Sequence, residues 1–463
     1  MAEFVLGVDS STQSCKALLV DAATGEIVDE RRAVHPSGTE VDPSAWVQAL
    51  DEVTEELLPR ASAVSIAGQQ HGMVLLDEDN QVVRDALLWN DTRSATEAKE
   101  LTAFLGGPQR AAELIGSVPL ASYTATKVLW VRKNEPENAA RATKIALPHD
   151  YLTLQLNTSQ ELYTDHGEAS GTAYYNTARR QWESSIAAWA IGHSVELPRL
   201  AEPAEAVGKT ATGALIAPGT GDNMGAALGL DLRDGDAVVS MGTSAVAMML
   251  SDSAPADYKN NVSGFADATG RYLPLACTLN GAPVMDFAAA TLGVDHDELA
   301  ELVLSASPGA QGAVFLPYLN GERTPNLPHA RSHLGNIGIG IQRRDVARAM
   351  VEGLACSVRE GLEKIVAQRG AEPRRIILIG GGAKSRAFRE VLAQVLGIDI
   401  YVPEPAEFVA LGAARQAAWV LSGQTNPPRW RQPEMMKVSA EKRPSIYRNY
   451  INYRNKLYPE VAS

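Results

Sequence analysis

Two short stretches of the sequence share one pattern, in which an apolar run, a turn rich in hydroxyl residues and a second apolar run follow each other. The first spans residues 4–20, with its turn at 9–14, and the second spans residues 237–250, with its turn at 242–244. Apolar runs broken by short turns of this kind are typical of β-hairpins. Two such hairpins far apart in one chain predict an internal duplication, in which one hairpin opens each of two domains.

The length and the later part of the sequence agree with two α/β domains. A chain of 463 residues exceeds the usual size of a single domain. Late in the chain, Asp345 can cap a helix that Gly370 ends, an apolar strand spans 375–379, and a further helix follows. This alternation of helices and strands indicates an α/β architecture. The two predicted domains are residues 1–232 and 233–463.

The net charge of −13 argues against nucleic acid as a partner. Basic residues are scattered along the chain, whereas a nucleic-acid site needs them clustered to neutralise phosphates. No apolar stretch approaches the length of a membrane span, and Glu3 stands where a signal peptide would carry positive charge. We therefore expect a cytoplasmic protein whose partners are small molecules, with no membrane or nucleic-acid partner.

The two hairpin turns are candidates for binding phosphate. A turn of Ser, Thr and Gly residues can point several backbone N–H groups and hydroxyls into one small concavity. Such turns are common, but two of them on duplicated domains could clamp a nucleotide from both sides. Asp9 is either an ordinary turn residue or a carboxylate at the end of a buried strand that helps to hold Mg²⁺. Thr12 and Lys16 beside it favour the second interpretation.

Two glycine-rich segments resemble nucleotide-binding motifs without satisfying them. Residues 379–385 lack the glycine spacing of a Walker loop, and residues 219–224 lack the third glycine of a dinucleotide fingerprint. The triple glycine of the first segment can instead let the backbone approach a base or ribose. The N-terminus of the helix that follows would then lie near a phosphate.

Asp222 is the candidate general base. It lies in a glycine-flanked segment, residues 218–225, shortly before the second hairpin. Phosphoryl transfer to an alcohol is helped by a carboxylate that takes the proton of the acceptor hydroxyl. The alternative is that Asp222 and Asn223 only cap a helix that begins at Met224. The position beside the second phosphate turn favours the catalytic role.

A further polar turn could bind a sugar. Residues 63–68 are predicted to form a strand, residues 69–72 a turn and residues 73–77 the returning strand. Gln70 and His71 at the tip of this turn can hydrogen-bond vicinal hydroxyls. A single histidine on a turn is, however, more often solvated or bonded locally.

Two further segments carry a resemblance to a known family. Residues 122–134, Ser-Tyr-Thr-Ala-Thr-Lys-Val-Leu-Trp-Val-Arg-Lys-Asn, resemble the first signature of the FGGY carbohydrate kinases. Residues 345–353 resemble the end of the second signature, which departs from the family pattern at Asn336, where the pattern has glycine. The resemblance extends over nearly the whole chain. It implies two actin-like ATPase domains of the ribonuclease H type, with a nucleotide cleft between them.

Three short motifs narrow the resemblance within the family. Residues 68–72, 88–93 and 320–325 are similar to the corresponding segments of the members that phosphorylate xylulose. The hydroxyl- and Trp-bearing second segment could line the sugar pocket. Its Asp91 and Arg93 could equally form a structural ion pair.

The resemblance also implies roles for individual residues. Asp222 matches the catalytic base, and Asp9 matches the carboxylate associated with Mg²⁺. The remaining matches are phosphate contacts at Thr12, Lys16 and Thr243, nucleotide-site glycines at Gly281 and Gly382, and sugar contacts at Gln70, His71 and Asn223. Glycerol kinases have an Arg-Glu pair in place of Gln70 and His71, which disfavours glycerol. At the nucleotide site Arg386 stands where the family often has asparagine.

The resemblance therefore implies an enzyme that uses ATP and Mg²⁺ to phosphorylate D-xylulose at its 5-hydroxyl, giving D-xylulose 5-phosphate in xylose catabolism. A kinase of another ketose, such as ribulose, or of a polyol is the nearest alternative. A non-catalytic sugar sensor would need a DNA-binding module and a chaperone ATPase would need a peptide-binding domain, and we expect neither from this sequence. The expected partners are the sugar and ATP, and a homodimer is left open.

Overall fold

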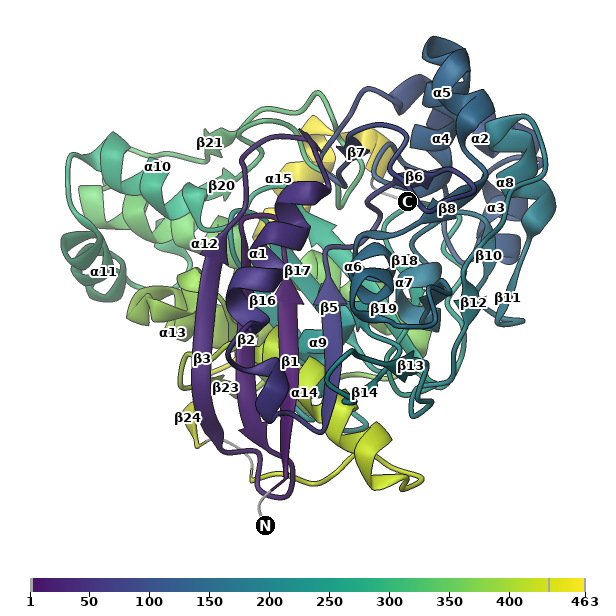
Figure 1. Cartoon of the computed structure of the whole chain (residues 1–463). Helices are drawn as coiled ribbons and strands as arrows, with labels where there is room; N and C mark the ends of the chain where they lie inside the picture. Colours follow the sequence, from purple (N-terminus) through teal and green to yellow (C-terminus); the bar gives the residue numbers. More distant parts are fainter. Residues whose placement is uncertain (1–2, 432–433, 462–463) are drawn as a thin grey trace.

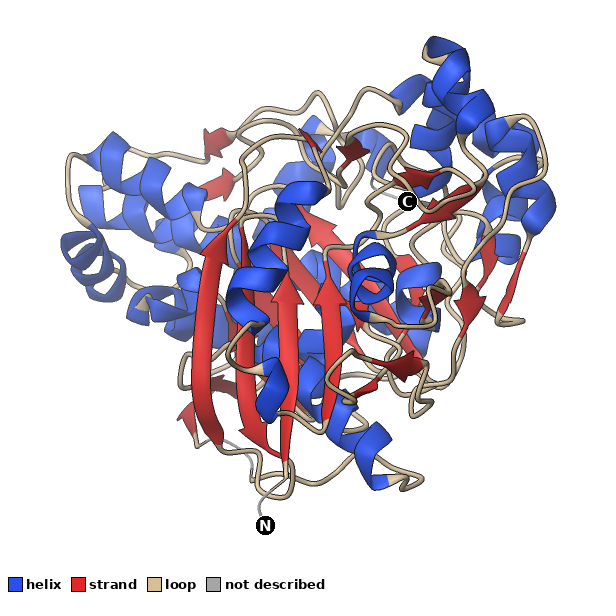
Figure 2. Ribbon diagram, viewed as in Figure 1, coloured by secondary structure: helices blue, strands red, loops and turns tan. Residues whose placement is uncertain are grey.

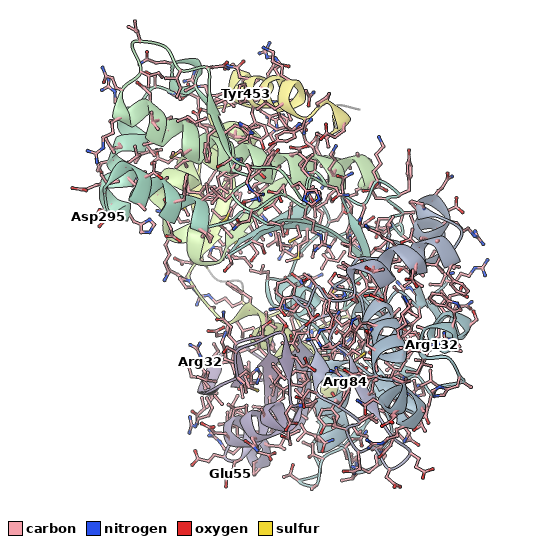
Figure 3. All side chains as sticks on the ribbon, turned by 90° about the horizontal axis from the view of Figure 1, so that it is seen from above. Arg32, Glu55, Arg84, Arg132, Asp295 and Tyr453 are labelled. Atoms are coloured by element: carbon pink, nitrogen blue, oxygen red, sulfur yellow. The ribbon has the colours of Figure 1, made fainter. Side chains whose placement is uncertain are left out.

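The computed structural model describes residues 3–431 and 434–461, and it consists of two α/β halves (Figure 1). The N-terminal half carries the purple and blue elements and the C-terminal half the green and yellow ones. Seen from above, Arg84 and Arg132 lie on the first half and Asp295 and Tyr453 on the second (Figure 3). Each half is built on its own seven-stranded sheet.

The first sheet is organised around β1 (Phe4–Ser10). This strand pairs antiparallel with β2 (Ser14–Asp21), which pairs with β3 (Ile27–Val34), and on its other side β1 runs parallel to β5 (Ala63–Gly68). Helix α1 (Ser44–Thr54) packs on β2 and β3. β1 and β5 are apolar and almost wholly buried because helices cover both faces of the sheet (Figure 2).

The second sheet repeats this arrangement. Its central strand β16 (Asp236–Met241) pairs antiparallel with β17 (Ala245–Met249), β17 pairs with β19 (Tyr272–Thr278), and β16 runs parallel to β22 (Arg375–Ile379). Both predicted hairpins are therefore present, as the antiparallel pairs β1–β2 and β16–β17. Their shared place in two sheets of like topology is what an internal duplication predicts.

The remaining elements complete the two halves. In the first half they are the strands β4 (Glu40–Val41), β6 (Val74–Leu76), β7 (Ala86–Leu87), β8 (Lys144–Ala146), β9 (Tyr163–Thr164), β10 (Tyr175–Asn176), β11 (Gln181–Trp182), β12 (Arg199–Leu200), β13 (Gly208–Lys209), β14 (Leu215–Ile216) and β15 (Thr220–Gly221), and the helices α2 (Ala95–Phe104), α3 (Pro108–Ile115), α4 (Thr124–Asn134), α5 (Pro136–Arg141), α6 (Pro148–Leu156), α7 (His166–Ala169), α8 (Ser184–Ile191) and α9 (Asp222–Gly229). In the second half they are β18 (Ser263–Ala266), β20 (Val314–Leu316), β21 (His333–Gly335), β23 (Ile400–Pro403) and β24 (Met435–Val438), and the helices α10 (Pro283–Leu292), α11 (His296–Ser305), α12 (Arg343–Arg369), α13 (Arg386–Leu396), α14 (Phe408–Ser422) and α15 (Pro444–Leu457). None of the helices within the described ranges combines the length and apolar character that a bilayer span requires.

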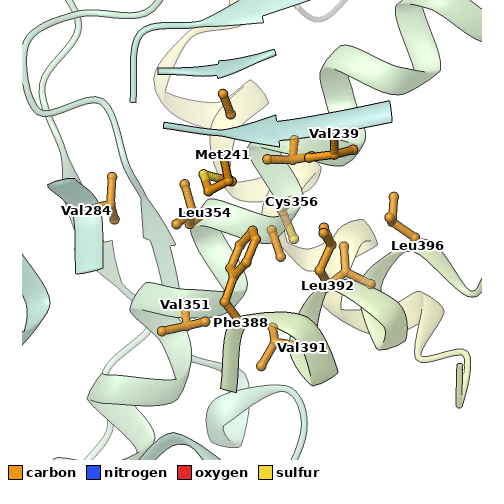
Figure 4. Packing of buried hydrophobic residues seen from close by; sticks show 14 of the residues in the cluster. Val239, Met241, Val284, Val351, Leu354, Cys356, Phe388, Val391, Leu392 and Leu396 are labelled. Atoms are coloured by element: carbon orange, nitrogen blue, oxygen red, sulfur yellow. The ribbon is translucent and has the colours of Figure 1, made fainter. Parts of the chain in front are cut away.

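The core of the second half forms between its sheet and two long helices. Phe388 of α13 lies among Met241 of β16 and Leu354 of α12, and all three side chains are buried (Figure 4). Gly382, in the turn after β22, packs against the same methionine, because a Cβ there would lie 2.2 Å from the Cγ of Met241. The core therefore fixes the position of the glycine turn.

Two local predictions differ from the structure. Helix α12 begins at Arg343, and Asp345 is its third residue, where the carboxylate accepts the backbone N–H of Gln342 in a capping box. The helix ends at Gly370 as predicted. The turn at residues 69–72 is not a hairpin tip: β6 pairs with β8, not with β5. That prediction was wrong because a short apolar run does not specify its partner strand.

Helix α14 crosses from the second half of the sequence onto the first sheet. It packs on β1 and β5 through Ala410, Ala414 and Ala417. It also crosses α9 so closely that a Cβ on Gly412 would lie 1.8 Å from the carbonyl oxygen of Gly225. Small residues are needed on both helices because their backbones are in direct contact.

We expect Gly412→Ala to destabilise the protein. The added methyl has no room against the Gly225 carbonyl, and overpacking of this kind costs roughly 1–3 kcal/mol or more of the free energy of unfolding. Gly361→Ala in α12 is the matched control, because its Cβ would lie 3.5 Å from that of Ala276, an ordinary contact, and alanine favours a helix. Urea unfolding measures both variants, and equal stability of the two would contradict the close crossing.

Candidate functional site

A cavity of about 640 Å³ is lined by residues of both halves. Its walls come from the β1–β2 hairpin, the start of α9, the turn after β22 and the loop between β23 and α14. The polar lining residues are Asp9, Ser11, Lys16, Asp222, Asn223, Ser240, Lys384, Arg389, Glu404 and Glu407. Strand ends and helix N-termini meet here because β1 and β22 both run toward the cavity.

Asp9 lies at the buried end of the first hairpin. The exposed fraction of its side chain is small, and its carboxylate accepts a hydrogen bond from the hydroxyl of Ser11. Burial raises the pKa of Asp9, and the hydroxyl of Ser11 and the charge of Lys16 oppose this shift. Asp9 thus presents a poorly solvated carboxylate to the cavity, which a cation would stabilise.

Lys16 connects the first hairpin to the start of α14. Its Nζ lies 2.6 Å from Oε2 of Glu407, the residue before α14, and 3.6 Å from Oδ2 of Asp9. Glu407 is itself partly exposed on the cavity wall. One ammonium group therefore lies between two carboxylates that come from opposite ends of the sequence.

Asp222 is the first residue of α9, and Gly221 before it is the N-cap. Its Oδ1 accepts the backbone N–H of Asn223 at 2.7 Å and the side-chain Nδ2 of Asn223 at 2.8 Å. Burial, together with the nearby charge of Asp9, raises the pKa of Asp222 to about 7, against the opposing effect of the Asn223 backbone N–H. The predicted helix cap for Met224 is therefore out of register, because the helix already begins at Asp222.

Gln70 is coupled to Asp222 through Asn223. The Nδ2 of Asn223 donates to Oε1 of Gln70 at 3.1 Å as well as to Asp222. Gln70 is buried, and its own Nε2 has no hydrogen-bond partner among the described residues. The structure thus brings three of the predicted residues, Gln70, Asn223 and Asp222, into one hydrogen-bonded chain.

His71 is buried next to this chain and has a left-handed backbone, with φ of 69°. Burial, with smaller effects from Lys127 and Arg323, lowers its pKa to about 3, so the imidazole is neutral. Its Nδ1 lies 2.7 Å from the carbonyl oxygen of Gly171, which makes Nδ1 the donor and leaves Nε2 as an acceptor. A neutral acceptor nitrogen suits a sugar hydroxyl as donor. His71 itself does not line the cavity.

The unusual backbone of His71 is held by the first signature segment. Its carbonyl oxygen accepts hydrogen bonds from Thr124 Oγ1 at 3.1 Å and from Nζ of Lys127 at 3.4 Å. Lys127 is fully buried, which lowers its pKa to about 7, and it also donates to the carbonyl of Ser122. These contacts compensate the cost of a left-handed non-glycine residue.

Thr12 and Thr243, at the tips of the two hairpins, do not line the cavity. Thr12 accepts a hydrogen bond from the indole Nε1 of Trp89 at 2.9 Å. Thr243 is exposed at the tip of the second hairpin, and its carbonyl accepts the N–H of Gly281 at 3.0 Å. Gly281 has no room for a side chain, because its Cβ would lie 2.5 Å from the carbonyl oxygen of Gly242.

The glycine turn presents a different residue from the one predicted. Gly381 is exposed and lines the cavity, whereas Gly382 is buried against Met241 and does not line it. Arg386 is also outside the lining and pairs with Glu390 on the surface of α13 at 2.9 Å.

The segment after Trp89 is held by a network of ion pairs. Arg93 lies 2.9 Å from Asp91 and 2.7 Å from Glu40. The carboxylate of Asp91 also accepts the hydroxyl of Thr39 at 2.8 Å. Of the two interpretations of Asp91 and Arg93, the structural ion pair matches these contacts.

Several functional candidates carried no local signal in the sequence. Glu407 and Phe408 reach the cavity only because α14 crosses onto the first sheet, and Glu168 lies beneath Gly221 through a contact that spans 53 positions of the chain. Lys384 and Arg389 supply positive charge on the cavity wall. Of these candidates, Lys384 alone lies in a segment with a recognisable sequence pattern, the glycine-rich segment of residues 379–385.

The acidic groups fit a hard divalent cation held together with phosphates. The described residues contain no cluster of three or more His, Cys, Asp or Glu side chains that could bind a metal alone. Mg²⁺ in kinases is usually bound by one or two carboxylates plus substrate phosphates and water, and Asp9 supplies a carboxylate on the cavity. The arrangement can therefore hold an anionic, metal-bound group between the halves while Asp222 accepts a proton.

Comparison with known proteins agrees with this architecture. The model of the FGGY family of carbohydrate kinases, N-terminal domain, matches residues 4–229, and that of the C-terminal domain matches residues 237–421. The chain is 44% identical over 437 residues to a xylulose kinase of Streptomyces coelicolor, covering 91% of this chain and 88% of that protein. It is 33% identical over 442 residues to a xylulose kinase of Escherichia coli, covering 89% of each.

Solved structures show the same fold. The xylulose kinase from Bifidobacterium adolescentis superposes with a TM-score of 0.93 at 43% identity, covering 98% of this chain and 99% of that chain. A glycerol kinase of Plasmodium falciparum with ADP, at 19% identity and a TM-score of 0.85, has this fold as well. The two-domain, actin-like ATPase architecture expected from the sequence is confirmed.

We expect Asp222→Asn to raise the thermal stability of the protein at alkaline pH. The pKa of Asp222 is raised to about 7 in the folded state, so its contribution to stability is fully present below the unfolded pKa near ~4 and is lost as pH rises through 7. Asparagine does not ionise, so the melting temperature of the variant should exceed that of the wild type at pH 8.

The gap between the two melting temperatures should close as pH falls toward the unfolded pKa. Asp51→Asn on the exposed face of α1 is the control, and it should show no such pH-dependent gap. Identical melting curves for Asp222→Asn and wild type at every pH would show that Asp222 is not destabilised by burial.

Proposed function

Because the chain belongs to the FGGY family of carbohydrate kinases, we propose that it transfers the γ-phosphate of ATP to the 5-hydroxyl of D-xylulose. The observation that carries the proposal is the hydrogen-bonded chain from Gln70 through Asn223 to Asp222, which ends on the cavity that Asp9 and Lys16 also line. The relatives at 44% and 33% identity are xylulose kinases, which supports the choice of sugar. The product would be D-xylulose 5-phosphate, an intermediate of xylose catabolism in the cytoplasm.

The proton of the acceptor hydroxyl would go to Asp222. Only Oδ1 of this carboxylate is occupied by Asn223, so Oδ2 is available to the sugar. A base with a pKa near 7 is ionised in part at neutral pH and takes up a proton readily as the new bond forms. The alkoxide character that develops on the sugar oxygen makes it the nucleophile for the γ-phosphorus.

Gln70, His71 and Asn223 would position the sugar. The neutral His71 offers an acceptor nitrogen, and the two amides offer donors and acceptors for the remaining hydroxyls. Holding the reacting hydroxyl in line with the phosphate supplies a large part of the rate, because little covalent chemistry is left to the protein.

The nucleotide would lie across the cavity, with its phosphates toward the first hairpin. Lys16, Lys384 and Arg389 are the cationic side chains on the walls, and the N–H groups of Gly380 and Gly381 stand at the turn after β22. Asp9 would hold Mg²⁺, which neutralises phosphate charge when bound. Thr12, Thr243 and Gly281 stay proposed phosphate and nucleotide contacts that require the halves to close on the ligand, and Gly382 would act by keeping Gly381 in place.

Asp222→Asn should nearly abolish phosphoryl transfer while ATP binding persists. Loss of a general base lowers the rate by roughly 10²–10⁴-fold, whereas the nucleotide contacts are unchanged. ADP release with D-xylulose measures transfer, and calorimetry with an ATP analogue measures binding. A variant that turns over at the wild-type rate would refute the assignment of Asp222 as base.

Substrate preference is tested on the wild type with D-xylulose, D-ribulose, L-ribulose and glycerol. We expect D-xylulose to have the highest kcat/KM, because Gln70 and His71 replace the Arg-Glu pair of glycerol kinases. A strong preference for another sugar would end the claim for xylulose and leave the carbohydrate kinase assignment intact.

The pH dependence should follow the ionisation of Asp222. The base must be deprotonated to act, so kcat/KM should fall as pH drops below about 7, by up to tenfold per pH unit. A pH–rate profile at saturating ATP measures this acidic limb. A profile that is flat from pH 5 to 8 would mean that proton transfer to Asp222 does not limit the reaction.

A further inference from the structure

Glu168 is a buried acid that the mechanism above does not use. It lies in the short helix α7 with none of its surface exposed, and neither carboxyl oxygen has a hydrogen bond of normal geometry to a described residue. The helix itself is capped by Asp165, whose carboxylate accepts the N–H groups of Gly167 and Glu168. Glu168 is therefore not needed as a helix cap, and its side chain requires another explanation.

The carboxyl of Glu168 lies directly behind the residue that precedes the proposed base. A Cβ on Gly221 would lie 2.7 Å from Oε2 of Glu168 and 2.8 Å from Cγ of Gln70. Both side chains therefore press on the same backbone position. Gln70 has an Nε2 donor with no partner, and Glu168 has two oxygens with none. The side chains that carry the unpaired donor and the unpaired acceptors therefore meet at Gly221.

The surroundings of Glu168 favour its uncharged form. Asp165, Asp150 and Asp222 all face it, and burial together with these three acids raises its pKa well above the usual range for glutamate. The backbone N–H of His71 is the group that favours the charged form, and its effect is the smallest. A neutral carboxyl has one carbonyl oxygen that accepts and one hydroxyl that donates.

We propose that Glu168 is a positioning residue for the sugar site: its carboxyl, which meets the Gln70 side chain at Gly221, is the acceptor for Nε2 of Gln70 once the sugar is bound, and so fixes the chain from Gln70 through Asn223 to Asp222. With Nε2 held from behind, Oε1 of Gln70 faces Asn223, where it accepts at 3.1 Å. Asn223 is then oriented to donate to Oδ1 of Asp222 at 2.8 Å. The proposal rests on the proposed function, since it assigns Glu168 a part in the same site.

This role predicts different effects for two substitutions. Glu168→Gln keeps a carbonyl acceptor in the same place and adds no charge, so the KM for the sugar and the acidic limb of the pH–rate profile should match the wild type. Glu168→Leu keeps the volume but removes the acceptor and leaves Nε2 of Gln70 unpaired. Loss of a buried hydrogen-bond partner should lower kcat/KM for the sugar by about tenfold to a hundredfold, with the KM for ATP unchanged.

The acidic limb supplies a readout that a purely structural role would not change. A hydrogen bond donated to an ionised carboxylate lowers its pKa, and Nδ2 of Asn223 donates one to Asp222, so loosening the Asn223 side chain in Glu168→Leu should move the limb to higher pH. If Glu168 were charged, Glu168→Gln would remove a negative charge near Asp222. The acidic limb of the pH–rate profile would then move to lower pH in this variant. That outcome would overturn the proposal.

The experiment measures kcat, the KM values for sugar and ATP, the pH profile and the melting temperature of each purified variant. Glu352→Gln is the control, since Glu352 is a buried acid of α12 that is bonded to Arg348 outside the cavity. It should lower the melting temperature and leave the sugar KM and the acidic limb alone. Glu168→Leu behaving like this control, or Glu168→Gln failing as badly as Glu168→Leu, would refute the role.

Failure of this inference is separable from failure of the proposed function. Each variant is compared with the wild type on whichever sugar the wild type phosphorylates best. If the wild type prefers another ketose, xylulose is refuted as the substrate. The ratio of kcat/KM between Glu168→Gln and Glu168→Leu on that ketose would still test the role of Glu168.

Discussion

The close crossing of α9 and α14 determines where the chemical groups of this protein stand. Gly412 and Gly225 bring the two backbones into contact, and Gly7 lets β1 approach α14, because a Cβ there would lie 2.0 Å from the carbonyl oxygen of Ala410. The first residue of α9 is Asp222 and the residue before α14 is Glu407. A contact that tolerates no side chain thus sets the spacing of two acidic residues on one cavity, with precision that longer side chains could not maintain.

The electrostatics of the cavity follow from this spacing. The charge of Asp9 raises the pKa of Asp222, the charge of Glu407 raises that of Asp9, and burial disfavours the ionised form of both. Lys16 offsets part of the cost by lying between Asp9 and Glu407. A site that concentrates poorly solvated carboxylates is less stable by itself than a neutral one, and it gains stability when a metal-bound phosphate arrives. Binding of a metal-bound phosphate would therefore offset the unfavourable burial of these carboxylates.

Local pattern was enough to predict some parts of the structure and not others. The hairpins of β1–β2 and β16–β17 follow from apolar runs and turn residues that are adjacent in the chain, and the end of α12 follows from Gly370. Asp9, Lys16 and Asp222 reach one cavity because each stands at the end of an element whose direction the pattern reveals. The partner of β6, the exposure of Gly381 in place of Gly382, and the approach of Glu168 to Gly221 depend on contacts between distant segments. Such contacts have no signature in a single stretch of residues.

The first signature segment shows how a motif can matter without touching the cavity. Lys127 is fully buried and far from ordinary lysine behaviour, since burial lowers its pKa to about 7. It and Thr124 both donate to the carbonyl of His71, whose left-handed backbone would otherwise be costly. Because the ring of His71 is fixed on its other side by Gly171, the signature sets the direction in which the acceptor nitrogen points. Under the proposed function, the motif would therefore act on sugar recognition through backbone geometry, and replacing Lys127 would change the site by releasing a strained residue and not by removing a ligand contact.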